Sequence, residues 1–196
     1  MGAKHKLVVI GDSLSQGFNN GGIYRTDINF PSFLARCFDS APNFQQPNFT
    51  AQAGIPINLE VLIRGLSEEF GSKIDWTEYL PAAAHTFKTL KRIKKYWEGG
   101  MKDLKVDRLT PYHNQAVWGF AINDSWIVNG RKSSEYIANN KESFSVFGVL
   151  PEHAKYTTSR LVLNPTLEEE YQENSQIDNA KLLQEDGGIE NLIVCL

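Results

Sequence analysis

The sequence KLVVIGDSLSQG, residues 6–17, holds the strongest fold signal in the chain. It begins with a short aliphatic and β-branched run that ends at Ile10, and the small residues Gly11-Asp12-Ser13 follow directly. An uninterrupted apolar run of this kind is typical of a strand that is covered on both faces. We therefore expect a buried strand that opens the fold and turns sharply after Ile10.

Two later segments share this strand character. Residues 114–117 are a second short strand candidate that runs into Trp118-Gly119, and residues 191–196 form a third, apolar strand candidate. Parallel strands need crossover connections, which helices supply, so strands that alternate with helices predict a parallel sheet. Helical spacing of apolar residues and helix-capping residues predict four helices, over 31–39, 58–70, 82–97 and 176–184.

Composition limits the class of protein. The chain has 196 residues, 41% of them hydrophobic, which suits one domain with its own core. A net charge of -3 gives the surface as a whole no general attraction to nucleic acid, although the predicted helix over 82–97 is locally basic and is expected to be a solvated face. We expect no nucleic-acid partner and no bound metal or cofactor.

Targeting and redox signals are weak. The first apolar run covers only residues 7–10, too short for a signal peptide, and no stretch approaches the ~20 apolar residues of a membrane span. We therefore expect a cytoplasmic protein without a membrane span. Cys37 and Cys195 lie among apolar neighbours, as buried free thiols do, so we expect no disulfide.

Ser13 is the first candidate for chemistry. A serine hydroxyl becomes a nucleophile when a base takes its proton and donors stabilise the oxyanion that forms. Ser13 directly follows the first predicted strand, at the end of a parallel sheet where active sites gather. Spacing alone supports equally well a simple role for Asp12 and Ser13 as caps of the next segment.

A family resemblance favours the catalytic interpretation. Residues 8–17, VVIGDSLSQG, resemble the first sequence block of the GDSL/SGNH hydrolases, esterases and lipase-like enzymes, with the four defining letters at Gly11, Asp12, Ser13 and Leu14. The resemblance implies a three-layer α/β/α fold of the SGNH, flavodoxin-like type with a parallel sheet. It also implies that Ser13 is the nucleophile and an oxyanion amide donor, that Asp12 orients the site from behind, and that the substrate is a small acyl ester.

A second block lies further along the chain. Residues 113–121, HNQAVWGFA, are similar to the family's Asn-x-Ala-x-x-Gly stretch, whose glycine offers its amide to the oxyanion. The resemblance therefore assigns this role to Gly119. Gly54 is a rival, but it lacks the preceding strand and the Asn-x-Ala context.

The remaining blocks of the family are not found in these residues. The family's third block should supply an asparagine just beyond the third strand, and Asn191 stands at the wrong end of that strand to replace it. The Asp-x-x-His pattern that supplies the base is absent, because no histidine is preceded by an acid at the required spacing. His85 and His153 are expected at the surface and His113 at a strand entry.

The resemblance thus covers the amino-terminal portion of such a domain. It implies one domain over 1–196, truncated after the third predicted strand and incomplete at the carboxyl end, with an insertion at about 40–111. We expect this chain alone to be a poor catalyst and to expose an apolar strand edge at 191–196. The alternatives are a non-catalytic, hydrolase-like binding module or a truncated gene product; the ester substrate and the oligomeric state stay open.

Overall fold

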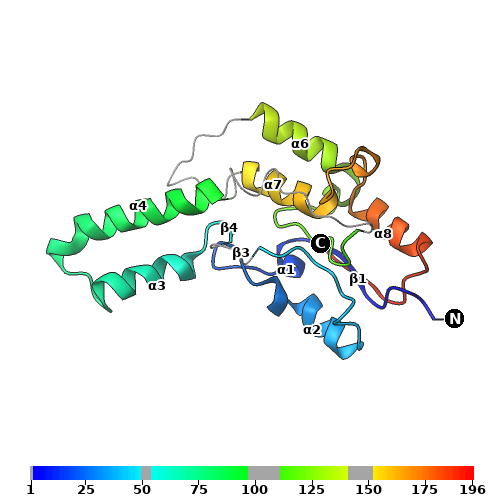
Figure 1. The fold of residues 1–196 in the computed structure, drawn as a ribbon, viewed down its shortest axis with the longest axis horizontal. Coiled ribbons are helices and arrows are strands. Elements are labelled where there is room, and N and C mark those ends of the chain that lie inside the picture. The colour runs from blue at the N-terminus through cyan, green and yellow to red at the C-terminus, as the bar shows by residue number, and fades with distance from the viewer. Residues whose placement is uncertain (1, 50–53, 97–110, 141–151) are drawn as a thin grey trace.

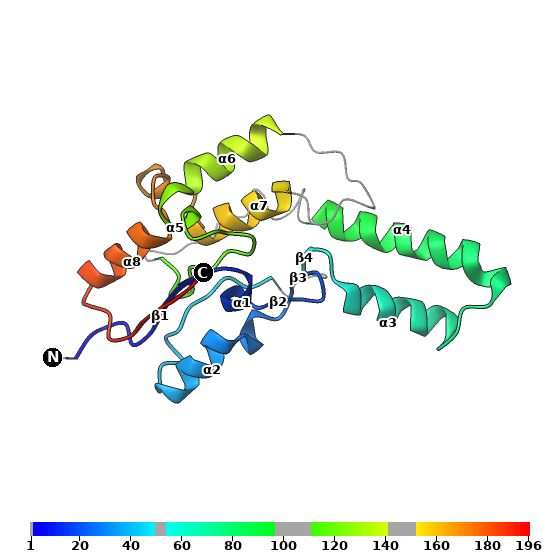
Figure 2. The same cartoon turned by 180° about the vertical axis from the view of Figure 1, so that it is seen from behind.

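The computed structural model describes residues 2–49, 54–96, 111–140 and 152–196. Figure 1 shows a body that contains a small parallel sheet with helices around it, and a helical hairpin that projects from this body. Figure 2 shows the same arrangement from behind. The body and the hairpin differ in how much apolar surface they bury.

A parallel pairing forms the centre of the body. Strand β1, Val8–Gly11, pairs in parallel with β5, Leu192–Cys195, at the other end of the chain. On its opposite edge β1 bonds to residues 113–117: the Val9 amide donates to the His113 carbonyl at 2.8 Å, and the Val117 amide donates to the Gly11 carbonyl at 3.1 Å. Strand β1 therefore lies between two parallel neighbours.

Helices cover both faces of β1. Val8 and Ile10 pack against α8, Gln176–Glu185, whereas the alternating residues Leu7 and Val9 pack toward α2, Phe30–Cys37. Because successive side chains of a strand point to opposite faces, this alternation places one helix on each side. The continuous apolar run in the sequence is explained by burial on both faces.

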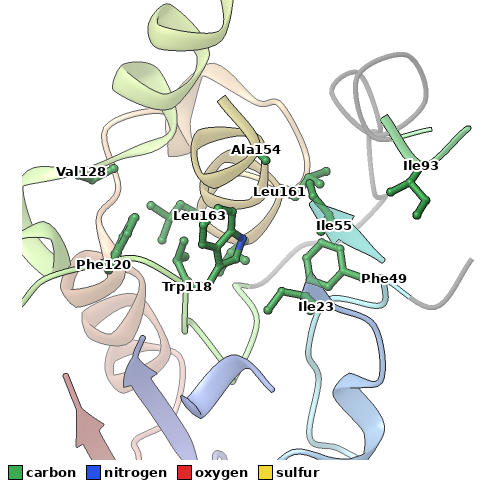
Figure 3. Packing of buried hydrophobic residues seen from close by; sticks show 12 residues of the cluster. Ile23, Phe49, Ile55, Ile93, Trp118, Phe120, Val128, Ala154, Leu161 and Leu163 are labelled. Atoms are coloured by element: carbon green, nitrogen blue, oxygen red, sulfur yellow. The ribbon is translucent and has the colours of Figure 1, made fainter. Parts of the chain in front are cut away.

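A second, larger core lies beside the parallel strands. It joins a small antiparallel sheet of β2, Phe18–Asn19, β3, Gly22–Ile23, and β4, Ile55–Pro56, to helix α7, Glu152–Leu163. Figure 3 shows Trp118 among the buried side chains of this core. Its indole N–H donates to the Thr158 hydroxyl at 3.1 Å, which satisfies the buried polar atom.

The projecting hairpin consists of α3, Leu59–Phe70, and α4, Tyr79–Tyr96, joined through the 3-10 turn η2, Trp76–Glu78. Figures 1 and 2 show the two helices side by side and directed away from the parallel sheet. No residue of α3 is buried. The remaining elements are α1, Ser13–Gln16, η1, Thr26–Ile28, α5, Asp124–Ile127, α6, Gly130–Asn139, and η4, Glu169–Tyr171.

Several sequence predictions can be compared directly with the observed elements. The mixed α/β class is confirmed, as are helices close to the predicted bounds with Asn58 and Ser175 as caps. The predicted strand at 114–117 is extended chain with a single parallel bridge, Val9 to Asn114. The edge predicted at β5 is apolar and exposed, at 51% for Leu192 and 59% for Val194.

Other predictions are wrong. Cys37 was expected to be buried but is exposed, because it ends α2 on the side away from β1, and Cys195 is half-buried. The helix predicted over 58–70 has an apolar stripe suited to a core, yet Leu59 and Ile63 of that stripe are exposed because α3 belongs to the hairpin and not to the body. None of the described helices is both long enough and apolar enough to cross a membrane.

Candidate active site

Ser13 lies where the first strand becomes a helix. Strand β1 ends at Gly11, Asp12 is the cap of α1, and Ser13 is the first residue of that helix. The Leu14 amide donates to the Asp12 carboxylate at 3.1 Å, which fixes the start of the helix. Ser13 is half-buried at this position.

Only glycine fits at position 11. A Cβ atom there would lie 2.3 Å from the Ser15 hydroxyl oxygen and 2.7 Å from the Cys195 carbonyl oxygen. The close approach lets the chain turn directly from β1 into α1 while β5 stays alongside. The glycine of the GDSL-like block therefore has a steric cause that is independent of catalysis.

Gly119 follows the neighbouring extended segment. The Val117 amide donates to the Gly11 carbonyl. Ser13 is two residues after Gly11 and Gly119 is two residues after Val117, so both lie at the carboxyl end of the sheet. Gly119 is exposed and has φ +77°, in the left-handed region that favours glycine. The Lys155 side chain lies beside it, with its Cδ 3.1 Å from the place of a Cβ atom.

Two backbone amides are available at this end of the sheet. Within the described residues, no acceptor takes up the amide hydrogen of Ser13 or that of Gly119. Ser13 is at a helix start, where the first amides have no partner inside the helix. Unpaired amides beside a serine are the donors that an oxyanion site requires.

Buried side-chain amides tie the two halves of the site together. The Trp118 amide donates to Gln16 Oε1 at 2.8 Å, which links helix α1 to the segment that ends at Gly119. Gln176 Nε2 donates to the Gly11 carbonyl at 2.9 Å and to the Gln115 carbonyl at 2.6 Å. Sequence reasoning missed both glutamines because a buried glutamine has no periodic or motif signal to distinguish it from a solvated one.

The four histidines lie elsewhere. His5 and His113 are buried at the amino end of β1, with 3.0 Å between His5 Nδ1 and His113 Nε2. The four residues of β1 separate them from Ser13 by roughly 13 Å of strand. His85 contacts Glu69 in the hairpin, and no hydrogen bond joins the Ser13 hydroxyl to a histidine in the described part of the chain.

The histidine pair has a defined arrangement of protons. The Gln45 amide donates to His113 Nδ1 at 3.0 Å, so that nitrogen is an acceptor and the proton of His113 is on Nε2. His113 then donates to His5, whose Nε2 lies 3.3 Å from the Asp186 carboxylate. His153 was expected at the surface but is buried at 9% exposure, because α7 packs inside the second core.

Two other sequence candidates lie away from Ser13. Asn191 is at the amino end of the sheet, where its side chain donates to the Lys6 carbonyl at 2.9 Å. Gly54 is buried beside β4, and a Cβ atom there would lie 2.5 Å from the Ile23 carbonyl oxygen. Packing against β3 thus accounts for glycine at position 54, whereas Gly119 has its amide at the sheet end.

Two carboxyl groups of the body have lowered pKa values. Burial acts to raise the pKa of the Asp178 carboxyl, but hydrogen bonds from Ser175 and Lys181 outweigh it, so that pKa lies below its ordinary value. The Lys4 ammonium holds the pKa of Asp186 below its ordinary value in the same sense. Among the described residues, no group of three or more metal-ligating side chains converges on one point.

Comparisons with known proteins identify no relative. No family model, no curated protein and no solved structure matches this chain. Any functional assignment therefore has to be argued from the geometry around Ser13 and Gly119 and from the family resemblance of their sequence blocks.

Proposed function

We propose that the chain carries the nucleophile and part of the oxyanion site of an ester hydrolase of the SGNH type. The proposal rests mainly on two backbone amides, those of Ser13 and Gly119. Neither has a hydrogen-bond acceptor among the described residues, and both lie at the same end of two adjacent parallel segments. In space the order is residues 113–117, β1, β5, which in chain order is second, first, third. Doubly wound sheets of the flavodoxin type begin with this order, which supports the proposed three-layer fold.

The chemistry follows from the positions of the groups. Ser13 Oγ attacks the acyl carbonyl carbon, and the carbonyl electrons move to oxygen, where the amides of Ser13 and Gly119 donate to the developing charge. The carbonyl re-forms as the alcohol leaves with a proton, and water then releases the acyl group from Ser13. Asp12 holds the first turn of α1, which fixes the direction of the Ser13 amide.

The proton acceptor is the missing part of this scheme. All four histidines are in the described residues, and none is bonded to Ser13. An efficient nucleophile needs its base at about 2.6–3.2 Å. We therefore expect these 196 residues by themselves to turn over p-nitrophenyl acetate only at a slow background rate.

The same observation supports a second candidate. A hydrolase-like module without a base would bind an acyl group or a carboxylate at the two amides and would not turn it over. The amide pair serves either candidate, and the reactivity of Ser13 separates them.

Phosphonylation tests the nucleophile directly. The folded chain is treated with an aryl fluorophosphonate, and the adduct is located by peptide mass spectrometry. Because no side chain in the described residues accepts the Ser13 proton, the reaction is followed up to about pH 10, where hydroxide can take that proton. We expect a slow adduct on Ser13 that is lost in Ser13→Ala and retained in Ser72→Ala, which changes an exposed serine of the hairpin. A folded chain in which Ser13 stays unmodified over the pH range would contradict the nucleophile assignment.

Amide resonances test the oxyanion site separately. Phenylboronic acid, whose boron becomes tetrahedral on adding an oxygen, is titrated into ¹⁵N-labelled chain. The hydrolase predicts shifts of both the Ser13 and the Gly119 amides together with the phosphonyl adduct. Shifts without any adduct would favour the binding module, and no shift at either amide would contradict the oxyanion site.

A further inference from the structure

The hairpin of α3 and α4 has two different faces. Its polar face is a groove of about 560 Å³, lined by charged and polar residues that include Glu60, Arg64, Glu68, His85 and Arg92. At 3.6 residues per turn, the apolar residues of each helix fall on the side opposite its groove residues. Both apolar stripes therefore lie on one face, which we call the hairpin face: Leu59, Ile63, Leu66 and Phe70 of α3 with Leu80, Ala83 and Phe87 of α4.

The hairpin face is open to solvent. Leu80 is 85% exposed, Ile63 64% and Phe87 54%, and Trp76 at the tip is 81% exposed. Apolar residues at helical spacing normally pack against a partner, and a contiguous exposed patch of them marks an interaction surface. Ile93, further along α4, is by contrast buried in the second core of the body.

Charge is unevenly distributed along the hairpin. Residues 68–78, around the tip, hold four acidic residues and one lysine, whereas residues 88–95, at the root of α4, hold five basic residues and no acid. The helix dipole of α4 favours the same polarity, but it does not account for the apolar stripe beside it. An acidic tip is repelled by an anionic lipid surface, so the charges favour a protein partner with the opposite gradient.

A second copy of this chain has that gradient when it lies antiparallel. We propose that the hairpin face is a self-association surface, through which two chains pair across a two-fold axis into a four-helix bundle. The acidic tip of each hairpin lies against the basic root of the other, and Leu80 and Phe87 pack across the axis. A two-fold contact uses the same patch on both copies, which one amphipathic hairpin satisfies. The proposal is independent of the function proposed for Ser13.

Molar mass in solution is the first test. By light scattering after gel filtration, we expect about twice the 22.1 kDa of one chain at tens of micromolar protein. Leu80→Glu with Phe87→Glu should return the mass to that of one chain, with an unchanged circular dichroism spectrum because both residues are exposed. Val194→Glu, on the exposed apolar strand β5, is the matched control and should leave the dimer intact.

A charge exchange tests the antiparallel arrangement. Lys88→Glu, Lys91→Glu and Lys95→Glu together make the root net acidic like the tip, and Asp75→Lys with Glu78→Lys makes the tip net basic like the root. Each set of changes alone should weaken self-association at least tenfold. The two sets together, or a mixture of the two variants, should restore it, because opposite charges then face each other again.

Other outcomes would overturn the proposal. They are a single-chain mass at 100 micromolar, a dimer that Val194→Glu disrupts and the hairpin variants do not, and charge variants that associate like the wild type. Binding of the wild-type chain to anionic vesicles without self-association would also count against it.

Discussion

The two ends of the molecule use apolar residues in opposite ways. Around β1, the strand residues 7–10 are almost fully buried, and helices on both faces contribute side chains such as Leu183 at 0% exposure. Along the hairpin, α3 has no buried residue, and side chains of the same size point to solvent. Strand β1 is covered on both faces by helices of this chain, while the hairpin face has apolar surface still available.

This difference separates two kinds of sequence signal. Gly11 lies where two backbones approach too closely for a Cβ atom, and Gln16 and Gln176 hydrogen-bond backbone groups of neighbouring segments. Each of these three positions therefore requires its particular residue. The hairpin keeps a helical pattern and a charge gradient but has no close backbone contact of that kind on its apolar face. The body should therefore respond to mutation through stability and the hairpin through association.

The largest expected effect comes from paired truncations of leucine. Leu183→Ala removes a buried side chain from the cluster around Val8 and Ile10 and should lower the free energy of unfolding by about 3 kcal/mol. Leu80→Ala, at 85% exposure, should change it by no more than about 0.5 kcal/mol at protein concentrations too low for association. Urea unfolding of both variants measures the two values, and equal losses would contradict the contrast between the regions.

A smaller effect is expected from glycine substitutions. Gly11→Ala places a methyl group against the Ser15 hydroxyl and the Cys195 carbonyl and should cost about 2 kcal/mol by overpacking. Gly71 ends α3 at φ +78° and ψ −162°, a backbone region that is essentially restricted to glycine, with open space around it. Its conversion to alanine should cost about 1 kcal/mol from backbone strain alone, the low end for such a region because the exposed turn can relax. Thermal unfolding monitored by circular dichroism ranks the pair. A larger loss at Gly71 would show that the end of β1 tolerates a side chain.

Local patterns made much of this architecture predictable from sequence. The apolar run before Gly11 predicted β1, and Asn58 and Ser175 predicted helix starts because their side chains cap backbone amides. What a helix packs against is not local: the stripe of Leu59 and Ile63 predicts an amphipathic helix whether its partner is the body or another chain. The helices α5, α6 and α7 were not predicted; in α7 the reason is that buried polar residues such as Thr157 and Ser159 break the apolar period.

The candidate site was predictable in part. Ser13 and Gly119 could be named because their sequence blocks resemble those of the GDSL/SGNH hydrolases and each follows a strand-like run. Both residues lie at the carboxyl end of adjacent parallel segments. Their roles stay a prediction, since no comparison identifies a family. Lys155 beside Gly119 was not predictable, because it comes from helix α7 and only the packing of that helix brings it there.

The smallest expected effect compares the capping residues of the two regions as pH changes. Asp178 accepts from the Ser175 amide and hydroxyl at 3.2 and 2.6 Å at the start of α8, and Glu78 accepts from the Asp75 amide at 2.9 Å in the hairpin tip. The pKa of Asp178 is lower in the folded chain, so its ionised form stabilises the fold above the unfolded-state pKa. That contribution is lost as the pH falls through the lowered value, below about pH 4.

Asp178→Asn should therefore be less stable than the wild type by about 0.5 kcal/mol at pH 7. This value is small because the carboxylate is partly exposed, and the difference should vanish near pH 2. Glu78→Gln should give a smaller difference at pH 7, since α4 begins outside any core. Urea unfolding of the three proteins from pH 7 to pH 2 measures both differences, and a gap between wild type and Asp178→Asn that widens on acidification would contradict the sign.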